Sequence, residues 1–505
     1  MSLKRLHKVG ILAWVMLLAN AFYSFSMNDE RLLSRNQAQE DIRIYFELID
    51  QQHGNPYQYI SRSDFKTLVN STIEQLPETV SVKEFEILLS QLNKTIRCGH
   101  TTVGIDNEFM KSITDRPNFF PYPIRIIDQS IIIDFESSDL PLGAEILSMN
   151  GIPAKQMLEE MKTLTVTDGF SETKSLRDIE NRFGYYFFLK YGAFTSFDVT
   201  YQSPENHLKN TKVVGIAGNE MLANNYYRPV YQQHERYYHF THLDAIDSLQ
   251  ALVLTLNTFQ ASPDWFYKKL ASRYNDNLEM FDFDNLVIDL RLNEGGDRRL
   301  LNILYKFITG EELKDPSKTH IRNRNIIQTK HLVGVNGSHG SDQAIERAEA
   351  YLNLHFTEKV KDGYAAKEQN WYETFDSGIA WEGKSFKGQV YVLISGTTFS
   401  AAADLARILG DLPNVILVGE ETGGANIGRT ANMLLNYSLP HTGSMIQVPV
   451  IYEEFVNVNT SINYGRGTFP DHWITQTYTD LLAKKDTAFE FTLQLMQSAQ
   501  VLGSK

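Results

Sequence analysis

The 505-residue chain is poor in cysteine and in positive charge, and each shortage excludes a class of protein. Its single cysteine, Cys98, allows neither an intrachain disulfide nor a cysteine-based metal site. The formal net charge of −13 argues against a nucleic-acid partner, because phosphate binding needs clustered Lys and Arg. With 42% hydrophobic and 22% charged residues, the chain has a globular composition, and its length predicts about two to four domains.

Long apolar runs are also missing, and the strongest one lies at the N-terminus. The basic "KRLHK" (4–8) precedes the apolar "VGILAWVMLLANA" (9–21), which is shorter than the roughly 20 residues of a membrane-spanning helix. Small residues follow near 19–21 and 24–26, so residues 1–26 are predicted to be a secretory signal. The alternative is an uncleaved membrane anchor. We expect a secreted or periplasmic protein with no stable membrane span after signal removal.

Motifs for metals and nucleotides are absent from the sequence. There is no His-Glu-x-x-His run, and "FDFDN" (281–285) lacks calcium-loop spacing. The Gly-rich "GEETGGANIG" (419–428) lacks the Lys-Ser/Thr ending of a phosphate loop, and "NEGGD" is not Gly-x-Gly-x-x-Gly. We therefore expect no metal and no cofactor.

The N-terminal half divides into a helical part and a β-rich part. Apolar residues recur at i, i+3, i+4 and i+7 in "FEILLSQLNKTI", and Ser81 with Glu84 forms a capping-box signal before this predicted helix. Short β-rich runs follow in "YPIRIID", "SIIIDF" and "AEILSMNG", and the last of these ends in an Asn-Gly turn. We predict a helical domain over 27–110 and a β-rich module over 111–225.

The C-terminal half alternates strands with helices, which predicts an α/β domain over 226–490. Strands are expected in "ALVLTLNTF", "NLVIDLRLNEGGD", "QVYVLIS" and "NVILVGEETGG". Ligands bind outside the carboxyl ends of such strands, so the turns at Gly295-Gly296, at Ser400 and at 420–424 should share one edge. The polar, poorly periodic residues 311–385 are either an insertion covering this edge as a lid or a solvated excursion.

Ser400 is the candidate nucleophile, because it ends a small-residue turn and precedes an apolar helical pattern in "GTTFSAAADLARILG" (396–410). A serine hydroxyl needs a base and an anion site, and N–H groups at a helix N-terminus can supply the latter. The alternative is a plain N-cap, a common role for serine before a helix.

Three motifs that occur in this order favour a nucleophile over a plain N-cap at Ser400: "VIDLRLNEGGD", "VYVLISGTTFSAAADLA" and "ILVGEETGG". Together they resemble the tail-specific, or C-terminal processing, serine peptidases and their tricorn-like relatives. "HGNPYQY" (53–59) and "CGHTTV" (98–103) resemble the leader of the tricorn-like branch, "GAEILSMNGIPA" (143–154) resembles a PDZ-like substrate-binding module, and "GRGTFPDHWI" (465–474) resembles the closing turn. The resemblance implies an α/β fold with a crotonase/ClpP-like peptidase core, an N-terminal helical domain and a PDZ-like β-rich module.

The catalytic base implied by the resemblance is His100. The processing branch places a Lys about 25 positions after the serine, but here that position is Ala425, and no lysine lies between Ser400 and Ala483. The base is therefore expected to be a histidine, with His441 and His472 as the other candidates. The structural alternative for His100 is a cap at the end of the leading helix.

The resemblance also implies donors for the oxyanion and an acid that orients the base. The oxyanion would be held by the N–H of Ala401 and by that of Gly295 or Gly296, where the alternative is a plain strand-to-helix turn. Asp289 and Arg291 are expected to form a buried structural pair. The Glu that should orient the base is replaced by Tyr464. The alternatives for that role are a hydroxyl group or one of four glutamates: Glu420, Glu421, Glu453 and Glu454.

We therefore expect an exported serine endopeptidase that cleaves unfolded proteins or peptides through an acyl-enzyme on Ser400. The alternative is a catalytically inactive peptide- or ligand-binding protein on the same scaffold. An esterase-like hydrolase is a third possibility, although Ser400 follows Thr-Phe and so lacks a Gly-x-Ser-x-Gly elbow.

Overall fold

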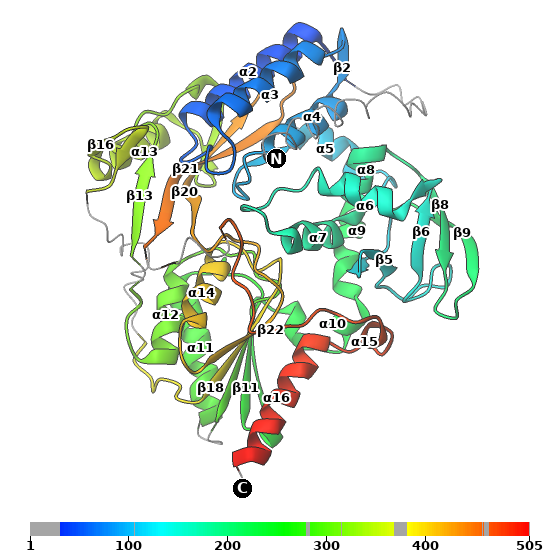
Figure 1. The fold of residues 1–505 in the computed structure, drawn as a ribbon, viewed down its shortest axis with the longest axis vertical. Helices are drawn as coiled ribbons and strands as arrows, with labels where there is room; N and C mark the ends of the chain where they lie inside the picture. The colour runs from blue at the N-terminus through cyan, green and yellow to red at the C-terminus, as the bar shows by residue number, and fades with distance from the viewer. Residues whose placement is uncertain are drawn as a thin grey trace, which may run out of the picture.

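A computed structural model describes residues 31–503, except 106, 279–282, 315, 368–380, 457 and 459–463. The expected signal segment, residues 1–26, lies outside the described residues. None of the described helices is both long and apolar enough to cross a membrane. The described chain forms three large sheets, each packed against helices (Figure 1).

The lower sheet in Figure 1 has the order β10-β11-β12-β18-β19-β22. Its strands are β10 (Thr241–Ile246), β11 (Ala251–Leu256), β12 (Asn285–Asp289), β18 (Gln389–Ile394), β19 (Val415–Gly419) and β22 (His472–Trp473). The strands from β11 onward are parallel, whereas β10 is antiparallel to β11. The central strands are buried along almost their whole length because helices cover both faces.

One face of this sheet packs against α11 (Pro263–Leu278), α12 (Arg299–Thr309) and α14 (Ala401–Gly410). The opposite face packs against α16 (Thr487–Gly503), which buries Phe489 and Met496 against β11, β12, β18 and β19. The carboxyl ends of β12, β18 and β19 lie side by side, since these strands are parallel and in register. The turns that follow them therefore share one edge of the sheet, as the alternation of strands and helices predicts.

The upper sheet joins segments from three parts of the chain. Its strands are β3 (Thr102–Gly104), β13 (Ser317–Ile321), β14 (Leu332–Val335), β15 (Ser338–His339), β16 (Glu358–Val360), β17 (Gly363–Ala365), β20 (Gly428–Ser438) and β21 (Met445–Phe455). It packs against α2 (Arg35–Gln51), α3 (Arg62–Gln75), α4 (Val82–Lys94) and α13 (Asp342–His355). The predicted capping box at Ser81 and Glu84 is present at the start of α4. The described part of 311–385 supplies five of these strands, so it is built into a sheet.

The third sheet has the order β4-β5-β6-β8-β9. Its strands are β4 (Ile124–Ile127), β5 (Ser130–Ile133), β6 (Glu145–Met149), β8 (Ser196–Gln202) and β9 (Leu208–Val214), and it packs against α6 (Ala154–Lys162), α7 (Glu172–Asn181) and α8 (Phe183–Tyr191). The Asn-Gly turn after β6 is confirmed, since Asn150 and Gly151 both have positive φ. Shorter elements are β1 (Leu32–Ser34), β2 (Thr79–Ser81), α5 (Asn107–Thr114), β7 (Ile152–Pro153), α9 (Gly218–Asn224), α10 (Pro229–Gln232) and α15 (Tyr478–Leu482).

Candidate active site

Ser400 occupies the N-cap position of α14, but its side chain does not cap the helix. Its backbone lies at φ 52° and ψ −127°, a region that non-glycine residues rarely adopt. Such a conformation costs on the order of 1–3 kcal/mol and persists only where the surrounding structure enforces it. The hydroxyl is thus held away from the helix N–H groups, in contrast to the plain N-cap alternative.

Hydrogen bonds to the neighbouring turn enforce this conformation. Thr398 donates its hydroxyl to the carbonyl of Leu290 at 2.9 Å, and the N–H of Phe399 donates to the carbonyl of Asn293 at 3.0 Å. On the other side, the N–H of Gly423 donates to the carbonyl of Thr398 at 2.9 Å. The turns after β12, β18 and β19 are therefore fastened together around the serine.

The structure brings His100 to Ser400 although 300 residues separate them. His100 Nε2 lies 3.0 Å from Ser400 Oγ, and its ring packs against Phe399 with centroids 4.7 Å apart. The other two histidine candidates lie elsewhere. His441 Nε2 lies 2.9 Å from Glu40 Oε2 on α2, and His472 on β22 packs against Phe491.

Three side chains hold the segment that carries His100. Gln447 donates to the carbonyl of His100 at 2.9 Å, and Asn93 donates to the carbonyl of Thr101 at 2.7 Å. His53 Nδ1 accepts the N–H of Asn55, so its Nε2–H donates to Thr101 Oγ1 at 2.8 Å. These contacts give a role to His53 and Asn55 of the "HGNPYQY" motif, which the sequence had linked only to the leader.

Burial lowers the pKa of His100 to about 3, and the positive charges of Arg429 and Lys174 act in the same direction. The carboxylate of Asp404 opposes this shift. His100 is therefore neutral at physiological pH, which is the form that accepts a proton.

Two backbone N–H groups are available near Ser400 Oγ. Ala401 is the first residue of α14, so its N–H has no partner within the helix. The N–H of Gly295 donates to Asn293 Oδ1 at 2.8 Å, which corrects the expectation that Gly295 could serve as an oxyanion donor. Gly296 lines the cavity at Ser400, and within the described residues its N–H makes no hydrogen bond.

None of the expected acidic residues contacts His100 within the described chain. Glu420 pairs with Arg177, Glu421 pairs with Arg466, Glu453 pairs with Arg298 and Arg429, and Glu454 is exposed on β21. Tyr464 is 50% exposed and donates its hydroxyl to the carbonyl of Gln58. His100 Nδ1 is buried and has no hydrogen-bond partner among the described residues.

A cavity of about 800 Å³ opens at His100 and Ser400. Apolar side chains of α13 and β20 line it, together with the buried cluster of Arg298, Arg429 and Glu453. Arg298 Nη1 lies 2.9 Å from Glu453 Oε1, and Arg429 also pairs with Asp404, so two arginines face two carboxylates. Residues of the 311–385 segment form one wall of the cavity.

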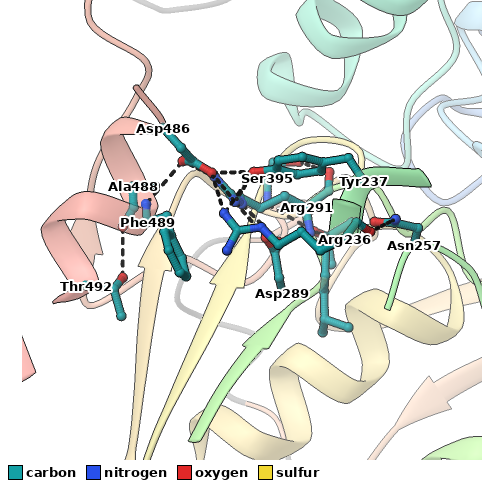
Figure 2. A network of polar contacts seen from close by, with 12 residues as sticks. Arg236, Tyr237, Asn257, Asp289, Arg291, Ser395, Asp486, Ala488, Phe489 and Thr492 are labelled. Atoms are coloured by element: carbon teal, nitrogen blue, oxygen red, sulfur yellow. Dashed lines mark hydrogen bonds and ion pairs between the residues drawn. The ribbon is translucent and has the colours of Figure 1, made fainter. Parts of the chain in front are cut away.

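Asp289 and Arg291 form the buried pair that their spacing suggested (Figure 2). Arg291 donates to Asp289 at 2.6 and 2.9 Å and to Asp486 at 2.6 and 2.7 Å. Asp486 precedes α16, and the network therefore ties the end of β12 to the last helix. Within this network the pair makes no contact with Ser400, so its role is structural.

Comparison with known proteins shows a match of the C-terminal part to a family model and a similarity of fold. Residues 250–471 match the family model described as peptidase family S41. The fold is similar to the crystal structure of mature CPAF, with a TM-score of 0.61 and 13% identity over 93% of this chain and 98% of that one. Mature CPAF complexed with lactacystin gives a TM-score of 0.62 and 13% identity over 93% and 99% of the two chains. No curated protein sequence matches the chain.

Proposed function

We propose that this chain is an exported serine endopeptidase acting on unfolded proteins or peptides, a proposal supported by the match of residues 250–471 to the model of peptidase family S41. The observation that carries the proposal is the 3.0 Å contact between His100 Nε2 and Ser400 Oγ at the open cavity. A nucleophile within hydrogen-bond reach of a neutral base is the minimum that acyl transfer needs.

Each residue then has one task. Ser400 Oγ attacks the peptide carbonyl carbon while His100 Nε2 takes the hydroxyl proton. The N–H groups of Ala401 and Gly296 donate to the oxyanion that forms. His100 returns the proton to the leaving amine, an acyl-enzyme remains on Ser400, and water releases it by the same steps.

The shape of the site favours an extended peptide as substrate. β14 pairs with residues 435–437 of β20, and no described strand pairs with residues 428–431 on that side. The cavity runs along this part of β20, so a substrate strand could add there through backbone hydrogen bonds. The β-rich module over 111–225 is proposed to bind substrate as a PDZ-like module does, and residues 1–26 to direct the protein to the periplasm or outside the cell.

The test is hydrolysis of an unfolded protein by the purified mature chain beside Ser400→Ala, with the fragments identified by mass spectrometry. We expect fragments from the wild type and none from the variant. A fluorophosphonate probe should label the wild-type serine only. Equal fragments from both proteins would contradict the role of Ser400.

The orphaned Nδ1 of His100 favours one rival, a catalytically inactive protein that binds peptides in the same cavity. That rival predicts no fragments and no labelling from the folded wild type, together with saturable binding of an unfolded peptide. A small-ester hydrolase predicts ester turnover without peptide cleavage.

A further inference from the structure

Two buried polar atoms lack hydrogen-bond partners, one in the candidate base and one in a carboxylate bonded to the preceding residue. His100 Nδ1 and Asp168 Oδ2 are both buried, and neither has a hydrogen-bond partner among the described residues. Asp168 is 4% exposed, and its other oxygen, Oδ1, accepts the N–H of Gly99 at 2.5 Å. A buried carboxylate oxygen without a donor is costly, so its retention next to the residue that precedes His100 calls for an explanation.

The segment that carries Asp168 is fixed in place on both sides. The N–H of Gly169 donates to the carbonyl of Arg97 at 2.9 Å, and the N–H of Phe170 donates to the carbonyl of Gly465 at 2.7 Å. The Arg97 guanidinium lies over the Phe170 ring, 4.3 Å from its centroid. Asp168 thus lies between the His100 segment and residue 465, next to the position where the expected acid is replaced by Tyr464.

Resting on the proposed hydrolysis at Ser400, we propose that Asp168 is the positioning residue for His100, with Asp168 Oδ2 accepting a hydrogen bond from His100 Nδ1–H when substrate closes the site. The two atoms are not bonded in this structure, and hydrogen bonds between catalytic groups often tighten only in the substrate complex.

The proton arrangement explains why this contact matters. His100 Nε2 accepts the Ser400 proton only if the ring carries its own proton on Nδ1. A carboxylate at Nδ1 selects that tautomer and stabilises the imidazolium that forms during the reaction. The four glutamates considered for this role have other partners or lie at the surface, whereas Asp168 Oδ2 makes no hydrogen bond to any described residue.

The charges around the two groups are consistent with the proposal. Burial raises the pKa of Asp168 to about 6, against the N–H groups of Gly99 and Ala425 and the cations Arg429 and Lys174. The carboxylate is therefore ionised at neutral pH. Arg429, Asp404, Lys174 and His53 are charged and titratable groups that act on or near His100. Tyr59 and Cys98 are titratable groups that face Asp168. A general base works best with a pKa near the working pH, and an ionised Asp168 would raise the pKa of His100 from its low value.

The variant Asp168→Asn tests the proposal with little disturbance of the fold, because its amide oxygen can still accept the Gly99 N–H. Its NH₂ group would face His100 Nδ1 and select the wrong tautomer. We expect kcat to fall by roughly 10²–10⁴-fold with little change in KM, as for loss of the carboxylate in a serine triad. Asp168→Glu should recover part of kcat. Wild-type kcat should rise with pH through about 6, following the ionisation of Asp168, and the Asn variant should lack this rise.

The control is Asp41→Asn, which alters a buried carboxylate of α2 that accepts from the N–H and the hydroxyl of Thr442. It should retain wild-type kcat. Nitrogen-15 NMR of His100, assigned with His100→Gln and recorded with an unfolded peptide bound to the Ser400→Ala protein, reports the tautomer directly and does not depend on turnover. We expect Nδ1–H where Asp168 is intact and Nε2–H when Asp168→Asn is added.

An unchanged His100 tautomer in a folded Asp168→Asn protein would overturn the proposal, whether or not activity falls. Loss of activity with lower thermal stability and no tautomer change would assign Asp168 a structural role and would also overturn it. An inactive wild type whose His100 tautomer still changes in Asp168→Asn would count against the proposed hydrolysis and in favour of the contact.

Discussion

His53 donates to Thr101 Oγ1 at 2.8 Å, so a buried histidine in the leader holds the residue next to the candidate base. Burial lowers the pKa of His53 to about 3, and it therefore remains neutral at physiological pH. The helical leader therefore contributes to the site through His53 as well as through the predicted base His100. Removing the hydrogen bond between His53 and Thr101 should therefore affect activity as well as stability.

We predict that His53→Leu lowers the free energy of unfolding by about 1–3 kcal/mol, because it leaves the Asn55 N–H and the Thr101 hydroxyl without their partner. Misplacement of the neighbouring imidazole should also reduce kcat by roughly 10–100-fold. Urea unfolding and hydrolysis of an unfolded substrate measure the two effects. His441→Leu, at the Glu40 contact, should leave kcat unchanged. Equal kcat values for both variants would contradict the prediction.

Gly295 tests how closely the backbone must approach the nucleophile. Its φ is 98°, and a Cβ there would lie 2.7 Å from Ser400 Cβ and 2.9 Å from Ala401 N. Gly295→Ala should abolish at least about 99% of kcat, because the new Cβ would displace the Ala401 N–H and loss of one oxyanion donor costs about 10²–10³-fold. Gly151→Ala is the matched control, because φ is 78° there but no atom lies within 4 Å of the new Cβ.

Both glycine variants should lose on the order of 1–3 kcal/mol of stability from the positive φ, and Gly295→Ala should lose on the order of 1–3 kcal/mol more from the close contacts of its Cβ. Thermal unfolding curves set the temperature at which both variants are folded, and activities are compared there. A normally active Gly295→Ala protein would show that the oxyanion is bound elsewhere.

The buried carboxyl group of Glu86 should make the free energy of unfolding depend on pH. It is 1% exposed, accepts from the hydroxyl of Ser444 at 3.0 Å, and burial raises its pKa from 4.5 to about 7. Between these values the folded state binds more protons than the unfolded state, so stability is lost as pH rises from about 4.5 to about 7. Glu86→Gln removes this loss and should be more stable than the wild type by about 3 kcal/mol at pH 8, relative to their difference at pH 4.

Urea unfolding of both proteins across this pH range measures the effect. A stability difference that does not change with pH would show that Glu86 ionises normally in the folded protein.

Asp486 joins Arg291, Arg236 and Tyr237 in the network of Figure 2. Burial acts to raise its pKa, but Arg291 and Arg236 outweigh burial and hold the pKa well below its ordinary value. Asp486→Asn removes the carboxylate that neutralises the buried arginines. It should lower the free energy of unfolding, measured with urea at pH 7, by about 3–5 kcal/mol. Asp264→Asn breaks the exposed Lys268 pair and should cost less than about 1 kcal/mol. Similar losses in the two variants would contradict a structural role for the network.

The sequence by itself determined what depends on neighbours along the chain. Apolar runs bounded by turn residues placed β12, β18 and β19, and their parallel pairing followed from the helices between them. Ser81 and Glu84 predicted the start of α4, since a capping box needs only two residues that lie three positions apart. The position of Ser400 at the start of α14 was predictable for the same reason.

The tertiary structure alone decided what each site residue can do. The 3.0 Å approach of His100 to Ser400 arises because β3 pairs with β21 across the upper sheet, and no local pattern encodes that pairing. Asn293 Oδ1 accepts the N–H of Gly295, and only this contact distinguishes Gly295 from Gly296 as a possible oxyanion donor. Asp168 had no sequence signal, because its place beside Gly99 depends on packing between segments about 70 residues apart. Local propensity fixes elements, whereas long-range packing fixes which polar groups meet and which remain without partners.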